Sequence, residues 1–155
     1  MDMLSSALTV LNKFVECNQE DQEAWLELSD IYLSKGSYSK ALFCLEEILS
    51  VHPKNYLLNL RYAEVLYSSH RQDRIGDLLN ARKYFSHAAI LKEDKKEPCI
   101  RALFGLVRTC KSIAAIARKN ENDDKNKEIL ETATQQIKEH YVRKGSSQLI
   151  SGWDQ

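Results

Sequence analysis

Apolar residues recur at helical spacing in two short stretches between Gln22 and Lys54, with polar residues filling the positions between them. In the first stretch the apolar positions are Trp25, Leu28, Ile31 and Tyr32. In the second they are Ala41, Leu42, Leu45, Ile48 and Leu49. Residues three or four apart share one face of a helix. Gly36 tolerates the positive φ of a helix end, and Pro53 cannot continue a helix. The pattern therefore predicts two amphipathic helices joined by a tight turn.

This stretch resembles a tetratricopeptide repeat, a unit of about 34 residues with preferred residues at fixed places. The matching residues are Trp25, Leu28, Tyr32, Gly36, Tyr38, Ala41 and Pro53. Ser29 replaces the usual glycine and Leu45 the usual aromatic residue. Ser29 and Ala41 are small, as two closely approaching helix backbones require. The alternative is an unrelated helical hairpin that shares the pattern by coincidence.

The rest of the chain extends this unit into an all-α fold. We predict a tetratricopeptide-repeat α-solenoid of antiparallel helix pairs over residues 1–144. Its predicted parts are a half repeat at 4–15, repeats at 22–54, 55–92 and 98–142, and a flexible tail at 145–155. The helix at 4–15 looks like the second helix of a preceding repeat. That reading favours a shortened array over a simple N-terminal cap, which stays the alternative, because a repeat buries its apolar face only against neighbours.

The second and third repeats depart from the regular unit. The loop near residues 70–76 is longer than its counterpart in the first repeat by six residues, and the helix after it is predicted to begin near Leu78. The third repeat opens with a long apolar helix over Cys99–Arg118. The mixed charges of Lys119–Lys127 predict a solvated loop, and the last helix is predicted over Glu128–Val142.

Composition excludes several function classes. The formal net charge of the 155-residue chain is zero, whereas a general nucleic-acid binder needs surplus cations for the phosphates, so no nucleic-acid partner is expected. The longest apolar runs fall far short of the roughly 20 residues that cross a bilayer, so we expect no direct membrane insertion. The four cysteines form no paired motif, which favours a reducing compartment.

No catalytic constellation is visible along the chain. The histidines are scattered, none has a zinc-ligand spacing, and neither a glycine-rich phosphate loop nor a nucleophile-elbow motif occurs. We therefore expect a binding module without catalytic residues, metal or cofactor, because a repeat scaffold that lacks such motifs most often binds other proteins. An enzyme with an unrecognised site is the alternative.

The resemblance also predicts where a partner binds. In tetratricopeptide repeats the first helix of each pair lines a concave groove. At those places we predict Leu26, Asp30, Leu33, Leu57, Leu60, Glu64, Tyr67 and Leu106. This set is apolar with acidic spots, and it lacks the Lys, Arg and Asn with which chaperone-binding repeats clamp a carboxylate. It suits an extended or helical segment with hydrophobic and basic residues. Alternatively, some of these residues pack against a further helix.

Several local strings are similar to one family more closely than to generic repeats. They are DQEAWLELSDIY (21–32), ALFCLEE (41–47), YAEVLY (62–67), ARKYFSHA (81–88) and RALFGL (101–106). The family is subunit 2 of the ER membrane protein complex. The resemblance implies a non-catalytic scaffold on the cytosolic face of the endoplasmic reticulum membrane. It would bind cytosolic segments of membrane subunits and the soluble subunit 8 or 9, and so support insertion of transmembrane proteins. A generic repeat adaptor or co-chaperone is the alternative.

Overall fold

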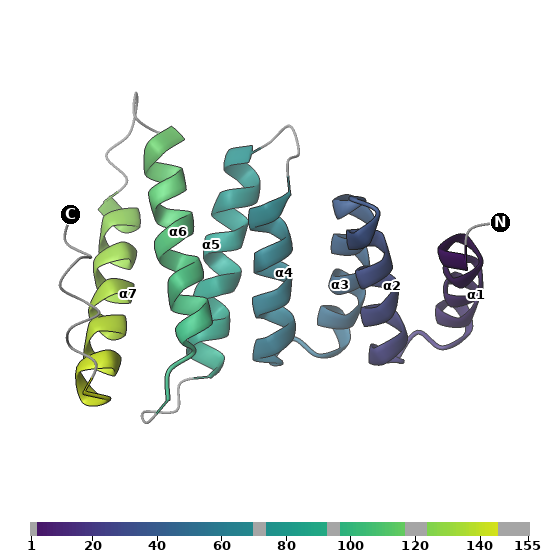
Figure 1. Ribbon diagram of the computed structural model, residues 1–155, viewed down its shortest axis with the longest axis horizontal. Coiled ribbons are helices and arrows are strands. Elements are labelled where there is room, and N and C mark those ends of the chain that lie inside the picture. The colour runs from purple at the N-terminus through teal and green to yellow at the C-terminus, as the bar shows by residue number, and fades with distance from the viewer. Residues whose placement is uncertain (1–2, 70–73, 93–96, 117–123, 146–155) are drawn as a thin grey trace.

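The computed structural model describes residues 3–69, 74–92, 97–116 and 124–145, and within these ranges the chain is helical, with no strand. The helices are α1 (Met3–Cys17), α2 (Gln22–Ser34), α3 (Tyr38–Val51), α4 (Tyr56–Ser68), α5 (Arg74–Leu91), α6 (Ile100–Ile116) and α7 (Asp124–Arg143). They stand side by side in chain order, from α1 at one end of the molecule to α7 at the other (Figure 1). This arrangement confirms the predicted all-α solenoid of stacked helices.

The turn between α2 and α3 forms as the sequence predicts. Gly36 has a φ of 69°, a conformation that costs little without a Cβ atom. The N–H of Gly36 donates to the carbonyl of Leu33 at 2.9 Å, and the N–H of Ser37 donates to that of Tyr32 at 2.8 Å. These bonds satisfy carbonyl groups at the end of α2, so the chain reverses within a few residues.

Two polar side chains cap the N-termini of α2 and α4, the helices between which the candidate binding groove lies. The carboxylate of Asp21 accepts a hydrogen bond from the N–H of Ala24 at 3.0 Å, at the start of α2. The amide oxygen of Asn55 accepts from the N–H of Leu57 at 3.0 Å, at the start of α4. Both residues thereby satisfy N–H groups that have no partner inside the helix.

The core runs between consecutive helices, and small residues sit where helix backbones approach closely. Ser29, Ala41 and Ala63 are fully buried. Gly105 of α6 lies directly against the ring of Phe85 in α5. The small residues at positions 29 and 41 therefore lie in the core, which agrees with the close helix contacts predicted there.

Two helices begin earlier than the sequence predicts. Helix α5 begins at Arg74 rather than near Leu78, and α7 begins at Asp124 rather than at Glu128. The prediction of a solvated loop is therefore wrong for residues 124–127. Its residues 119–123 lie outside the described residues, as do 70–73 of the long loop and 146–155 of the predicted tail.

The environment of Asn126 explains why the charged stretch Lys119–Lys127 is wrongly predicted to be a loop over residues 124–127. Its side chain is 4% exposed. It donates to the carbonyl of Cys110 at 2.9 Å and accepts from Arg82 at 2.8 Å. A buried amide with hydrogen-bond partners is compatible with a core, but a sequence does not show such partners. The division into repeats stays a prediction.

Within the described ranges, no helix is both long enough and apolar enough to span a membrane.

Candidate partner-binding groove

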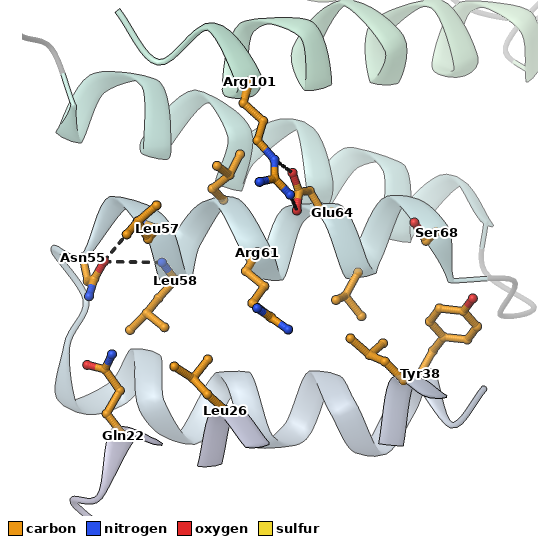
Figure 2. Close-up of a pocket in the computed structure, with 13 residues that line it drawn as sticks. Gln22, Leu26, Tyr38, Asn55, Leu57, Leu58, Arg61, Glu64, Ser68 and Arg101 are labelled. Atoms are coloured by element: carbon orange, nitrogen blue, oxygen red, sulfur yellow. Dashed lines mark hydrogen bonds and ion pairs between the residues drawn. The ribbon is translucent and has the colours of Figure 1, made fainter. Parts of the chain in front are cut away.

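A groove of about 600 Å³ opens between α2 and α4 and extends to the first residues of α3 and α6 (Figure 2). Its apolar lining consists of Leu26, Leu33, Leu57, Leu58, Leu60 and Val65. Its polar lining consists of Gln22, Tyr38, Asn55, Arg61, Glu64, Ser68 and Arg101. The groove is therefore an apolar surface edged by charged and amide groups, a composition suited to a peptide segment.

The structure brings five of the predicted site residues to this groove: Leu26, Leu33, Leu57, Leu60 and Glu64. Leu57 is the most accessible of the leucines, with 56% of its surface exposed, whereas Leu60 is only 4% exposed. Leu60 therefore lines the groove with a small part of its surface and belongs mainly to the core, and its contact with a partner stays a prediction. Helix α4 is covered by neighbours on both sides, so most of its apolar positions are buried.

The other three predicted residues lie outside the groove lining. Asp30 is exposed and pairs with Arg61 at the groove margin. Tyr67 contacts α6 through its hydroxyl, 3.2 Å from the Ser112 hydroxyl. Leu106 is 5% exposed, so the expectation that it faces a partner is wrong. Helix α6 lies between α5 and α7, and Leu106 is part of the core between them.

Two arginines change the electrostatics of the groove. Arg61 forms an ion pair with Asp30. Arg101 donates from Nε and Nη2 to the two carboxylate oxygens of Glu64 at 2.5 and 2.8 Å, the two-point geometry that makes arginine–carboxylate pairs specific. The acidic spots predicted from the sequence are thus matched by cations. Hydrogen bonding to Glu64, and then its negative charge, raise the pKa of Arg101.

Sequence reasoning missed these cations. It predicted a groove without Lys, Arg or Asn, yet Asn55, Arg61 and Arg101 all line it. Counting positions along one helix overlooks long side chains that reach over from a neighbouring helix. One signal was available, because Asp30 and Glu64 recur at the repeat period and an arginine follows each on the next first helix.

The ion pairs orient side chains more than they stabilise the fold. The Arg101 side chain is 72% exposed, and exposed pairs contribute about 0–1 kcal/mol. In Figure 2, Arg61 projects from α4 into the middle of the groove, and Arg101 reaches across from α6 to Glu64. The groove therefore presents oriented charges beside an apolar surface.

A second cationic feature lies beside the groove, between α4 and α6. The guanidinium groups of Arg74 and Arg108 each lie 5.4 Å from the centre of the Tyr67 ring, within the range of a cation–π contact. A hydrogen bond with Ser112, and then the positive charge of Arg108, lower the pKa of Tyr67. The α6 side of this face is therefore electropositive.

The cysteines and histidines of the described ranges form no group that could hold a metal ion. Cys44, Cys99 and Cys110 are buried, and burial raises the pKa of the Cys44 thiol to about 11. The Nδ1 atom of His87 lies 3.1 Å from the amide oxygen of Asn59. These side chains are accounted for by packing and hydrogen bonding within the fold.

Comparisons with known proteins give consistent results. A family model described as the EMC2 TPR-like repeat domain matches residues 1–75. ER membrane protein complex subunit 2-B of Xenopus laevis is 37% identical over 142 residues, which cover 91% of this chain and 46% of the relative. ER membrane protein complex subunit 2 of Dictyostelium discoideum is 36% identical over 71% of this chain and 35% of the relative.

Among solved structures, a crystal structure of MamA protein matches over 90% of this chain and 85% of that one, with 13% identity and a TM-score of 0.42. The chain spans about half the length of the Xenopus relatives that it matches. The family model, the relatives from Xenopus and Dictyostelium and the observed helical solenoid together show that the chain belongs to the ER membrane protein complex subunit 2 family.

Proposed function

We propose that this chain is a non-catalytic scaffold part of the ER membrane protein complex, and that its groove holds a cytosolic segment of a membrane subunit. The observation that carries the proposal is the groove between α2 and α4, where accessible leucines lie beside two oriented ion pairs. Segments that bind in such grooves place apolar residues in pockets and polar groups at the rim. Holding such segments would support insertion of transmembrane proteins by the membrane subunits.

The proposed site comprises Leu26, Leu33, Leu57 and Glu64, with Asp30 at its margin. Leu57 is the best single contact because 56% of its surface is exposed in the free chain. The proposed location is the cytosolic face of the endoplasmic reticulum membrane, reached through partner proteins. The membrane subunits, together with the soluble subunit 8 or 9, are the proposed partners.

The test is co-purification from solubilised endoplasmic reticulum membranes. A tagged full-length chain is expressed in cells as wild type, as Leu57→Glu and as Leu79→Glu. Leu79 is the matched control, since it is an exposed leucine of α5 that does not line the groove. We expect the wild type and Leu79→Glu to recover the membrane subunits, and Leu57→Glu to lose most of them. Circular dichroism should show that all three chains keep their helices.

Two results would refute the proposal. If the wild-type chain recovers no membrane subunit, the proposal that it belongs to the complex is refuted. If the Leu57→Glu chain recovers as much of the membrane subunits as the wild type, the groove is not the binding site. Leu60→Glu is unsuitable for this test, because Leu60 is 4% exposed and a charge there would disturb the core.

A co-chaperone role is the second candidate, since Asn55, Arg61 and Arg101 line the groove and are of the residue types that clamp a terminal carboxylate in chaperone-binding repeats. All three are already engaged, however: Asn55 caps α4 and the arginines pair with Asp30 and Glu64. Chaperone C-terminal peptides with a free carboxylate, compared with amidated copies, would distinguish the roles. Salt-sensitive binding of the free acid alone would favour the co-chaperone.

A further inference from the structure

Helix α6 carries an arginine, Arg108, that takes no part in the ion pairs of the groove. Arg101 and Arg108 are seven residues apart, close to two full helical turns, and therefore share one face of α6. Arg101 is bound to Glu64. Arg108 is exposed, and no carboxylate of the described ranges forms an ion pair with it. Arg108 therefore contacts the Tyr67 ring but has no matching negative charge within the described ranges.

A second cation stands next to it in a fixed position. Arg74 donates through Nη1 to the carbonyl of Tyr67 at 2.6 Å and to that of Ser69 at 2.7 Å. Its guanidinium and that of Arg108 each lie 5.4 Å from the centre of the Tyr67 ring. Two guanidinium groups on one aromatic ring concentrate positive charge at the end of α4.

Helix α2, on the other side of the groove, carries the other sign of charge on exposed residues outside the groove lining. Helix α2 contains no Lys or Arg and carries Glu23, Glu27 and Asp30. Within the part of the chain that the structure describes, Asp30 is the only one of these that forms an ion pair, with Arg61. Charge therefore changes from acidic at α2 to basic at α6. An acidic group in a bound segment would be favoured only where it lies beside α6.

The spacing between the apolar and the basic parts sets the pattern of the occupant. Leu57 lies at the start of α4 and Tyr67 lies ten residues later, so the two are about 15 Å apart along the helix axis. An extended chain advances roughly 3.3 Å per residue. About five residues of an extended segment would therefore separate a side chain against Leu57 from one beside Arg108.

We propose that the segment held by this groove carries hydrophobic residues followed, about five positions later, by a cluster of aspartate or glutamate that contacts Arg108 and Arg74. This inference rests on the proposed function, since it specifies the chemistry of the same occupant. The sequence alone predicts a basic segment, whereas the structure favours an acidic one. Arg61 and Arg101 already pair with Asp30 and Glu64, the acidic residues on which the expectation of a basic segment depends. Charge-assisted hydrogen bonds from the two guanidinium groups would fix the direction of the segment.

The test uses short fluorescein-labelled peptides that share one leucine-containing core and end in a cluster of glutamates, serines or lysines. Binding to the full chain is measured by fluorescence anisotropy at low and high salt. Each exposed ion pair contributes only modestly to binding, and two guanidinium groups act together here. We therefore expect the glutamate peptide to bind about tenfold more tightly than the serine peptide. The difference should shrink with added salt.

Two variants locate the effect. Arg108→Glu should abolish the preference for the glutamate peptide over the serine peptide. Lys125→Glu makes the same charge change at an exposed position of α7 and should keep the preference.

Equal or tighter binding of the lysine or serine peptide overturns the inference, and so does failure of all the peptides to bind. A preference that survives Arg108→Glu also overturns it. None of these results touches the scaffold proposal, which co-purification decides. Conversely, a preference that depends on Arg108 in a chain that recovers no membrane subunit would keep the inference and refute membership of the complex.

Discussion

Gly105→Ala offers a direct test of how α5 and α6 are packed. A Cβ atom added at Gly105 would lie 2.4 Å from Cε1 and 2.6 Å from Cδ1 and Cζ of Phe85. Carbon atoms pack best at about 3.5–4.0 Å, so these atoms would be roughly 1 Å too close. Phe85 is 3% exposed and its ring is enclosed by the core. The ring therefore cannot move aside cheaply.

The size of the effect follows from two opposing contributions. Replacing a glycine inside a helix by alanine normally raises the free energy of unfolding by about 0.5–1 kcal/mol. Overpacking a well-filled core lowers it by about 1–3 kcal/mol. With three ring atoms in severe overlap, the second contribution should prevail. We expect a net loss of about 1–2 kcal/mol, equivalent to a fall in Tm of roughly 2–8 °C for a chain of this length.

Urea and thermal unfolding followed by circular dichroism would measure this loss in the wild type, Gly105→Ala, Phe85→Leu and the double variant. The smaller leucine makes room for the new methyl group, so Gly105→Ala should cost much less in the Phe85→Leu background. That coupling is the signature of direct contact. A single Gly105→Ala variant that is stabilised, or costs that simply add, would refute the packing of α5 against α6.

Three further predictions concern buried polar groups. The hydroxyl of Ser29 is buried without a hydrogen-bond partner in the described ranges, so Ser29→Ala should raise the free energy of unfolding by about 1 kcal/mol; a loss measured in urea would contradict this. Asn126→Ala removes hydrogen bonds to Arg82 and Cys110 and should cost about 1–3 kcal/mol, which an unchanged Tm would disprove. The pKa of Cys44 rises from 9.0 to about 11 on folding, so the folded state holds its proton while the unfolded thiol ionises. The stability from this group, present below about pH 9, should therefore fall by about 1–3 kcal/mol between pH 9 and pH 11. Cys44→Ala should lack that part of the decline in urea unfolding, and an identical decline would refute it.

The sequence by itself determined the regular turn and where helices form, apart from the starts of α5 and α7. Trp25, Leu28 and Tyr32 share one helical face, and Gly36 supplies a positive φ that its neighbours avoid. Ser29 and Ala41 mark close contacts between backbones, and both are fully buried. These features depend on residues a few positions apart, so periodicity and single-residue conformational preferences are enough to find them.

Only the tertiary structure decided which of these faces a partner can reach and what charge it meets there. Leu57 and Leu60 lie one helical turn apart, yet they are 56% and 4% exposed, because neighbouring helices cover one and leave the other open. Arg101 enters the groove from α6 to bind Glu64 of α4, and a buried Asn126 is satisfied from another helix. Burial and ion pairing are set by residues far apart in the chain, and helical periodicity carries no information about how far a long side chain reaches across to its neighbour.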